Sequence, residues 1–310
     1  MTFLHQTVFQ DQAAEILCAV PGSRFVDATL GGGGHAAAIL ARRPDAELLG
    51  IDRDPSAIAA ASQRLAPFAS RVHFRHDRFS NLEACAASIG WQTVDAVILD
   101  LGVSSPQIDS PERGFSFRFD GPLDMRMDPS ATTETAADLL NNRPETQLAD
   151  IFFNYGEERM SRRIARAIVA RRQEKPWRQT AELAQLLEKV VGYRHQHGLH
   201  PATRCFQALR IAVNHELEEL ESTLPVAARL LNPLGRFVVI SFHSLEDRLV
   251  KNFFRHESAT CVCPPGLPIC VCGKTATMTI LTRKALRPTA SETQANPRAT
   301  CAKLRAASKR

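Results

Sequence analysis

Short apolar segments alternate with helix-forming segments over the first hundred residues. Apolar and β-branched runs of four to nine residues predict strands, and the alanine-rich stretches between them predict helices. The strands are expected at 24–29, 47–52, 72–77 and 94–102, and the helices at 34–43, 55–66 and 79–88. Asp54 followed by Pro55 is typical of an N-cap with proline in the first helical turn. This alternation predicts right-handed βαβ units and a parallel sheet, an α/β fold.

The pattern changes after the fourth strand. The next strand is predicted at 235–243, and an amphipathic helix at 203–222 precedes it. About a hundred residues before that helix are too many for a loop in a compact domain, so an inserted all-helical subdomain is expected. Its best helix, 158–173, has an apolar stripe that includes Ile164 and Ile168. The predicted layout is a first part at 1–104, the insert at 105–200 and a second part at 201–310, with a terminal strand pair at 277–286 and 301–307.

Composition and charge narrow the class of protein. The chain has 310 residues, 44% of them hydrophobic and 23% charged, as in soluble globular proteins. A net charge of +5 permits a polyanionic partner. The N-terminus lacks the features of a secretory signal, and the absence of long apolar runs argues against a membrane partner. Eight cysteines in such a chain favour thiols or metal ligands over disulfides, so a cytoplasmic protein is expected. The oligomeric state is left open, with a homodimer allowed.

Four consecutive glycines, residues 31–34, follow the first predicted strand in FVDATLGGGGHAAAIL. Glycines between a strand and a helix are typical of a nucleotide-type cofactor lying against the main chain. Asp52 stands 21 residues after Gly31, at the end of the second strand, where a carboxylate can accept hydrogen bonds from ribose hydroxyls. The run departs from the dinucleotide-binding pattern G-x-G-x-x-G, so the cofactor could be either a dinucleotide or S-adenosylmethionine. A turn required only for helix–sheet packing is the alternative.

The fourth strand ends in DLGVSSPQ, residues 100–107, at the edge where open α/β sheets bind ligands. An acidic residue before a sharp turn there suits methyl transfer to an exocyclic amine, because a carboxylate can accept the amine protons and orient the nitrogen lone pair. Asp100 is the predicted catalytic residue, with Ser104 and Gln107 as polar neighbours. The alternative is that Asp100 only caps the turn.

Six stretches together resemble one family. DATLGGGGH, IDRDP, DLGVSSPQIDSPERGFSFRFDGPLDMRMD, YGEERMSRRIARAIV, HPATRCFQALRIAVN and ISFHSLEDR are similar to the RsmH (MraW) family of bacterial 16S rRNA cytidine-N4 methyltransferases, in order along nearly the whole chain. The resemblance implies a Rossmann-like class I S-adenosylmethionine-dependent methyltransferase sheet with an inserted substrate-recognition domain, and 16S rRNA or the small ribosomal subunit as partner. The cofactor contacts that it implies are Gly33, Gly34, His35, Asp52, Phe79, Asp100 and Gln107, with Phe79 packing against the adenine.

Two rival functions remain beside this one. A nicotinamide-dependent oxidoreductase would need a pyrophosphate site, which contiguous glycines support poorly. A non-catalytic rRNA-binding assembly factor that keeps the cofactor fold is the other.

The chain departs from the family or from related enzymes at several points. Gln12 and Gly32 replace an acidic and a basic residue that are frequent in the family. The tetrapeptide DLGV lacks the aromatic residue with which DNA amino-methyltransferases stack the base. Phe115, Phe117 and Phe119 are therefore candidates for stacking, and the core face of a short strand is the alternative interpretation.

Basic residues indicate where RNA phosphates could bind. The insert helix has Arg162 and Arg166 on its polar side, Arg118 and Arg126 lie beside the catalytic turn, and residues 274–310 include nine basic residues and one acid. A solvated helical face is the alternative for the insert cluster. His243, at the tip of the fifth strand, is a substrate contact or a structural histidine, and Ser244 with Asp247 is predicted to cap the helix that follows.

Four cysteines lie within twelve residues of each other in CVCPPGLPICVCG. Cys261, Cys263, Cys270 and Cys272 form two C-x-C pairs around a proline turn, which could supply four sulfur ligands to a structural zinc ion. C-x-C is tighter than the common C-x-x-C spacing, so metal-free thiols are an equal alternative.

Overall fold

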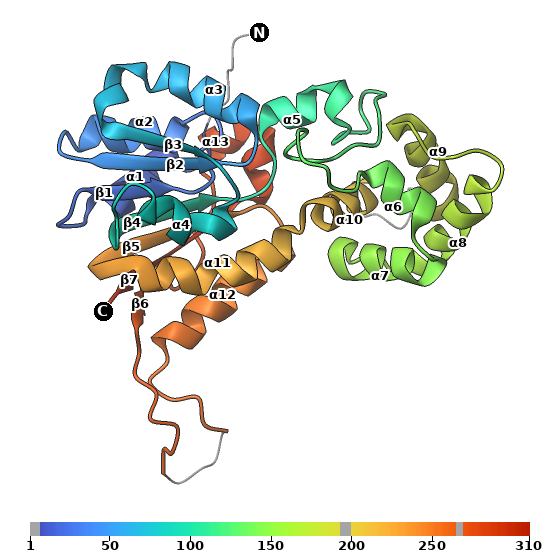
Figure 1. Cartoon of the computed structure of the whole chain (residues 1–310). Helices are drawn as coiled ribbons and strands as arrows, with labels where there is room; N and C mark the ends of the chain where they lie inside the picture. The colour runs from blue at the N-terminus through green and yellow to red at the C-terminus, as the bar shows by residue number, and fades with distance from the viewer. Residues whose placement is uncertain (1–6, 193–199, 265–268) are drawn as a thin grey trace. The chain divides into compact units, whose positions relative to one another are not determined.

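Within the residues that the structure describes (7–192, 200–264 and 269–310 of this computed structural model), seven strands form one sheet in the order β3-β2-β1-β4-β5-β7-β6 (Figure 1). β1 to β5 run parallel, and β7 is antiparallel to both of its neighbours. This is the sheet of a Rossmann-like class I methyltransferase, as the resemblance implied. The strands are β1 (Arg24–Asp27), β2 (Glu47–Asp52), β3 (Val72–His76), β4 (Val94–Asp100), β5 (Leu231–Ser241), β6 (Met278–Ile280) and β7 (Lys303–Lys309).

The sheet is buried on both faces, which explains why its central strands read as apolar runs. All of β4 before Asp100 is buried, and so is β5 from Phe237 to Ser241. Strand order reverses between β1 and β4, and ligands of open α/β sheets bind at such a switch point, beyond the carboxyl ends of the strands. A ligand is therefore expected at the tips of β1, β2 and β4.

The chain divides into two compact units, and the sheet belongs to the first, which comprises residues 1–102 and 218–310. Its helices are α1 (Gln10–Cys18), α2 (Gly34–Arg42), α3 (Pro55–Arg64), α4 (Leu82–Ala87), most of α11 (Glu216–Leu230), α12 (Ser244–Ser258) and α13 (Ala290–Ala295), with short 3₁₀ turns at Ala66–Arg71, Phe79–Asn81 and Pro297–Cys301. The predicted cap of α3 is confirmed, because Asp54 Oδ1 accepts a hydrogen bond from Ser56 N at 2.9 Å. The predicted terminal strand pair is β6 with β7.

The second unit, residues 103–217, is helical. Its core surrounds the fully buried Trp177 and Phe152 and includes Ile164 and Ile168 of the predicted stripe. Its helices are α5 (Ser105–Asp109), α6 (Ala136–Asn142), α7 (Glu145–Gly156), α8 (Ser161–Arg172), α9 (Thr180–Val191) and α10 (Thr203–Asn214), with a 3₁₀ turn at Pro111–Arg113.

The single helix predicted at 203–222 is wrong: α10 ends at Asn214, and α11 (Glu216–Leu230) begins after it. His215 between them has a left-handed backbone with φ 54°. The buried Asn214 is engaged in tertiary contacts, since its Oδ1 accepts from Met127 N at 2.8 Å and its Nδ2 donates to Met125 O at 2.7 Å. Because α10 packs against α7, the second unit extends to Leu217, beyond the boundary at residue 200 expected from the sequence.

No helix in the part of the chain that the structure describes is long and apolar enough to cross a membrane.

Candidate active site

Three acidic residues stand at the carboxyl ends of neighbouring parallel strands: Asp27 ends β1, Asp52 ends β2 and Asp100 ends β4. The turn after β1 is hydrogen-bonded to both flanking strands, because Leu30 N donates to Ile51 O at 2.9 Å and Asp100 N donates to Thr29 Oγ1. The turn therefore fixes the three carboxylates relative to one another at the switch point.

Asp52 closes the glycine loop (residues 31–34) onto β2. Its Oδ2 accepts from Gly31 N at 2.7 Å, and its Oδ1 accepts from Asp54 N at 2.8 Å. Burial raises the pKa of Asp52 to about 6, and these two backbone hydrogen bonds partly oppose that rise. Near neutral pH the side chain is a carboxylate with both oxygens oriented by main-chain donors.

Two glycines of the glycine loop are required by packing within the protein itself. Gly33 is the N-cap of α2 and has φ 73°, and a Cβ there would meet Ala61 Cβ and Leu65 Cδ1 at 3.3 Å. At Gly34 a Cβ would stand 1.8 Å from Thr7 Oγ1. Packing within the first unit thus requires glycine at 33 and 34. A Cβ at Gly31 would meet nothing nearer than Thr29 O at 3.9 Å, but the φ of 50° there disfavours other residues.

His35 lies next to Asp100 at the start of α2. Its side chain is 4% exposed, and Nε2 is 3.5 Å from Asp100 Oδ2, whose side chain is 17% exposed. Among the described residues, Asp100 Oδ1, Asp27 Oδ2 and both ring nitrogens of His35 are buried without a protein hydrogen-bond partner. Buried polar atoms are nearly always hydrogen-bonded, so these four atoms at the switch point are available to water or to a polar ligand.

A family model described as the MraW methylase family matches residues 2–310. The chain belongs to this family. It is similar to the ribosomal RNA small subunit methyltransferases H of Carboxydothermus hydrogenoformans (50% identical, covering 100% of this chain and 99% of that protein) and Oleidesulfovibrio alaskensis (52% identical, covering 98% and 94%). Among solved structures it is similar to an rRNA methylase from Streptococcus thermophilus (13% identical, TM-score 0.42, covering 97% of this chain and 93% of that chain). As a MraW methylase, the protein is an enzyme that transfers methyl groups.

Two residues near the carboxyl edge of the methylase sheet were not singled out from the sequence. Asp27 is 1% exposed and ends a strand that reads simply as FVD, and only the parallel alignment of β1 with β4 places it near Asp100. Glu219, 6% exposed on α11, binds the guanidinium groups of Arg78 at 2.8 Å and Arg53 at 3.4 Å. No local sequence signal distinguishes Glu219 from the other acids of that helix.

Phe79 follows β3 in a 3₁₀ turn and packs, partly buried, against the core of the first unit. This turn is connected to β2 through Asp77, whose N donates to Asp52 O at 3.0 Å. This hydrogen bond links the turn that holds Phe79 to the end of β2 that holds Asp52.

His243 serves as the N-cap of α12, and its partner is Glu246, with His243 Nε2 3.1 Å from Glu246 Oε1. The predicted capping pair Ser244 and Asp247 is therefore wrong by one position. Asp247 instead accepts hydrogen bonds from Lys303 Nζ and Arg305 Nε, each at 2.7 Å, and so connects α12 to β7. Those two cations of the basic C-terminal segment have structural partners.

The second unit holds the other predicted contacts. Gln107, 6% exposed, accepts from Ser104 N at 3.0 Å in the capping box of α5. Arg126 is paired with Asp124 through two hydrogen bonds of 2.7 and 2.8 Å and donates to Ala131 O, so its guanidinium is used within the unit.

The three phenylalanines of GFSFRFDG form no strand, so the predicted short strand is wrong, although two of the three pack on the core as that alternative expected. Phe117 stacks on His200 with ring centroids 4.4 Å apart and packs edge-on against Phe206. Phe115 lies partly buried on the same core, whereas Phe119 is 53% exposed. The irregular backbone follows from Gly114, whose φ of 70° and 2.0 Å approach of a Cβ to Pro122 O exclude other residues.

Five arginines of the insert separate into two groups by exposure. Arg118, Arg162 and Arg166 are exposed, the last with a 3.7 Å contact to Glu145. Arg172 donates to Leu140 O and Arg143 O, and Arg171 lies 4.1 Å from the centroid of the Trp177 ring. Only the first group presents charge at the surface of the unit.

Asp27→Asn is expected to stabilise the protein at alkaline pH. Burial raises the pKa of Asp27 from 3.8 to about 7, so the folded chain keeps a proton that the unfolded chain loses. The free energy of unfolding therefore falls as pH rises from about 4 to 7, and the penalty is complete above pH 7. The variant lacks that penalty, and its Tm should exceed that of the wild type by several degrees at pH 8. The difference should shrink towards pH 5, and a constant or inverted difference across this range contradicts the assignment.

Proposed function

We propose that this MraW methylase transfers a methyl group from S-adenosylmethionine to the exocyclic N4 amine of a cytidine in the decoding region of 16S rRNA, in the cytoplasm. The observation on which the proposal depends is the Asp100 carboxylate at the switch point, beside His35 and with Oδ1 free of protein partners among the described residues. The target follows from the family resemblance and from the names of the rRNA small-subunit methyltransferases to which the chain is similar.

The residues at the edge of the sheet fit such a cofactor. When bound, S-adenosylmethionine supplies an electrophilic methyl group on a sulfonium centre. Asp52 would accept hydrogen bonds from the ribose hydroxyls, and Phe79 would pack against the adenine. The unpartnered polar atoms of His35 and Asp100 match the polar groups of the methionine portion, and the main chain of Gly33 and Gly34 would line the cofactor. Gln107, the remaining contact that the family implies, would act from α5.

Asp100 would act on the amine itself. The lone pair of an exocyclic amine is delocalised into the ring, which makes the nitrogen a poor nucleophile. A carboxylate that accepts hydrogen bonds from the amine protons would take the lone pair out of conjugation with the ring and stabilise the positive charge that develops on nitrogen. The carbon–sulfur bond of the methyl donor would break as the nitrogen–carbon bond forms, and the nitrogen would then lose its charge by releasing a proton. Partial burial strengthens this interaction, because fewer water molecules compete for the carboxylate.

The second unit would recognise the RNA. Arg118, Arg162 and Arg166 are exposed cations suited to phosphate, and Arg283, Lys284 and Arg287 of the C-terminal segment are exposed as well. Phe119 and the partly buried Phe115 are the candidates for stacking on the displaced base. Arg126 is a weaker candidate, because Asp124 already neutralises it.

Nucleotide mapping tests this proposal. Small-subunit rRNA from cells that lack the protein should lose one N4-methylcytidine in the decoding region, and the purified enzyme with S-adenosylmethionine should restore it on isolated subunits. Expression of Asp100→Asn in the deleted cells should restore the protein level but not the modification. Restored assembly without any methyl transfer would favour the non-catalytic assembly factor. Binding of NAD without binding of S-adenosylmethionine would favour the oxidoreductase.

A further inference from the structure

We propose that Cys261, Cys263, Cys270 and Cys272 (the cysteine cluster) bind one structural zinc ion through four thiolates. The four Sγ atoms all lie within 4.8 Å of one another. Cys261, Cys263 and Cys272 lie 3.5, 4.0 and 3.5 Å from Cys270, sulfur to sulfur, and Cys272 lies 3.9 Å from Cys261. A tetrahedron with Zn–S bonds of about 2.3 Å has S–S edges of about 3.8 Å. The sulfurs therefore stand where the corners of a zinc tetrathiolate would be.

The sulfur–sulfur distances also show that these cysteines are not joined in disulfide bonds. A disulfide bond requires sulfurs about 2.05 Å apart, and each measured separation here is at least 3.5 Å. Two backbone amides point at the sulfurs: Val262 N donates to Cys272 Sγ, and Cys263 N donates to Cys261 Sγ, both at 3.4 Å. Amide donors of this kind stabilise the negative charge of metal-bound thiolates.

The cluster lies in a segment that lacks a hydrophobic core. None of the described residues at 259–264 and 269–277 is buried. The apolar side chains of Val262, Ile269 and Val271 are 49%, 77% and 77% exposed, whereas the cysteines that alternate with them bring their sulfurs close to one another. Apolar burial cannot hold such a segment in one conformation, whereas four metal–sulfur bonds can.

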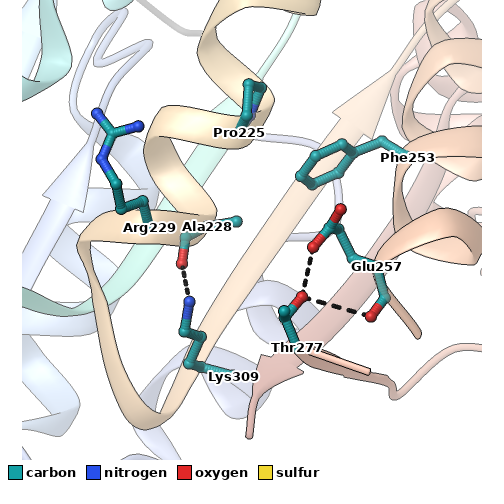
Figure 2. Close-up of a pocket in the computed structure, with 7 residues that line it drawn as sticks. All are labelled: Pro225, Ala228, Arg229, Phe253, Glu257, Thr277 and Lys309. Carbon is teal, nitrogen blue, oxygen red and sulfur yellow. Dashed lines mark hydrogen bonds between the residues drawn. The ribbon is translucent and has the colours of Figure 1, made fainter. Parts of the chain in front are cut away.

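The base of the segment is closed by protein contacts (Figure 2). Thr277 N donates to Glu257 O at 2.9 Å. Thr277 Oγ1 also donates to the Glu257 carboxylate and to Glu257 O. A small hollow, lined also by Phe253 and Lys309, lies beside these contacts. The segment would thus be held at two places, by metal bonds at the cysteines and by hydrogen bonds at Thr277.

The position of the segment indicates a structural role for the metal. It leaves α12 and returns to β6, and Met278 at the start of β6 pairs with Lys309 near the amino-terminal end of β5 (Figure 1). Asp100 lies at the opposite, carboxyl end of the parallel strands. The zinc would therefore shape this projecting segment and take no part in methyl transfer.

Elemental analysis of the untagged full-length enzyme, purified without chelators, tests the proposal. We expect about one zinc per chain, and its loss in the double variant Cys261→Ser/Cys272→Ser. Cys301→Ser is the matched control, because Cys301 is an exposed cysteine outside the cluster and its variant should keep the metal. A Tm close to that of the wild type, or a near-normal circular dichroism spectrum, will show that the methylase body of the double variant still folds.

Cobalt(II) provides a second readout. Metal-free protein should take up one cobalt ion and show the intense visible absorption of tetrahedral thiolate coordination, in the wild type and in Cys301→Ser but not in the double variant. Chelation should speed proteolytic cleavage within residues 259–276 while methyl transfer stays within about twofold of its original rate. Absence of zinc together with absence of the cobalt spectrum would overturn the proposal, as would zinc retained by the double variant or iron in place of zinc.

Discussion

Asp100→Asn is expected to slow methyl transfer by about 10²–10³-fold at saturating cofactor, the loss typical of removing one preorganised polar group from an active site. The amide keeps the size of the side chain but carries no negative charge, and it directs a donor at the amine protons that the carboxylate accepts. The rate should be measured in single turnovers on isolated small subunits, so that product release does not mask the chemical step.

The matched control for Asp100→Asn is Glu83→Gln. Glu83 is a surface carboxylate, 56% exposed and paired with Arg229, so its replacement makes the same change of charge away from the switch point. The control should methylate at the rate of the wild type. If Asp100→Asn also keeps that rate, Asp100 only caps the turn after β4, and the catalytic proposal is wrong.

Asp52→Ala is expected to weaken cofactor binding by roughly 10²-fold. Two charge-assisted hydrogen bonds to ribose hydroxyls contribute on the order of 3 kcal/mol, which corresponds to about a hundredfold in Kd. Calorimetric titration with S-adenosylhomocysteine measures this loss without turnover. Asp45→Asn, on an exposed loop carboxylate, is the control and should leave Kd unchanged.

Binding should also depend on pH through Asp52. Its pKa is raised to about 6, and only the ionised form accepts both hydrogen bonds, so affinity should be constant above pH 7 and fall below pH 6. At pH 5 only about a tenth of the enzyme is ionised at this site, which predicts about a tenfold weaker Kd. Asp27, with a pKa of about 7, titrates nearby, and the same dependence should therefore persist in Asp27→Asn. A pH-independent Kd would show that the Asp52 carboxylate does not bind the cofactor.

Elements with strong local signals were predicted closely. The strand expected at 47–52 is β2 residue for residue, and Asp54 caps α3 as its sequence indicated. Periodicity failed where a tertiary contact overrides it: both halves of 203–222 are amphipathic, but Asn214 bonds to the main chain at Met125 and Met127, and the helix ends there. No pattern in the segment itself predicts that break.

The candidate site shows the same division. By spacing alone, the sequence determined the glycine loop, Asp52 at the second strand tip, Asp100 at the fourth and four cysteines close enough to share a metal, because each of these depends on residues near one another in the chain. Tertiary structure decided that Asp27 and His35 lie near Asp100, that Thr7 leaves no room for a side chain at Gly34, and that Asp247 neutralises Lys303 and Arg305. Those features depend on contacts between residues far apart in sequence, and a contact of that kind leaves no local pattern of hydrophobic and polar positions from which it can be predicted.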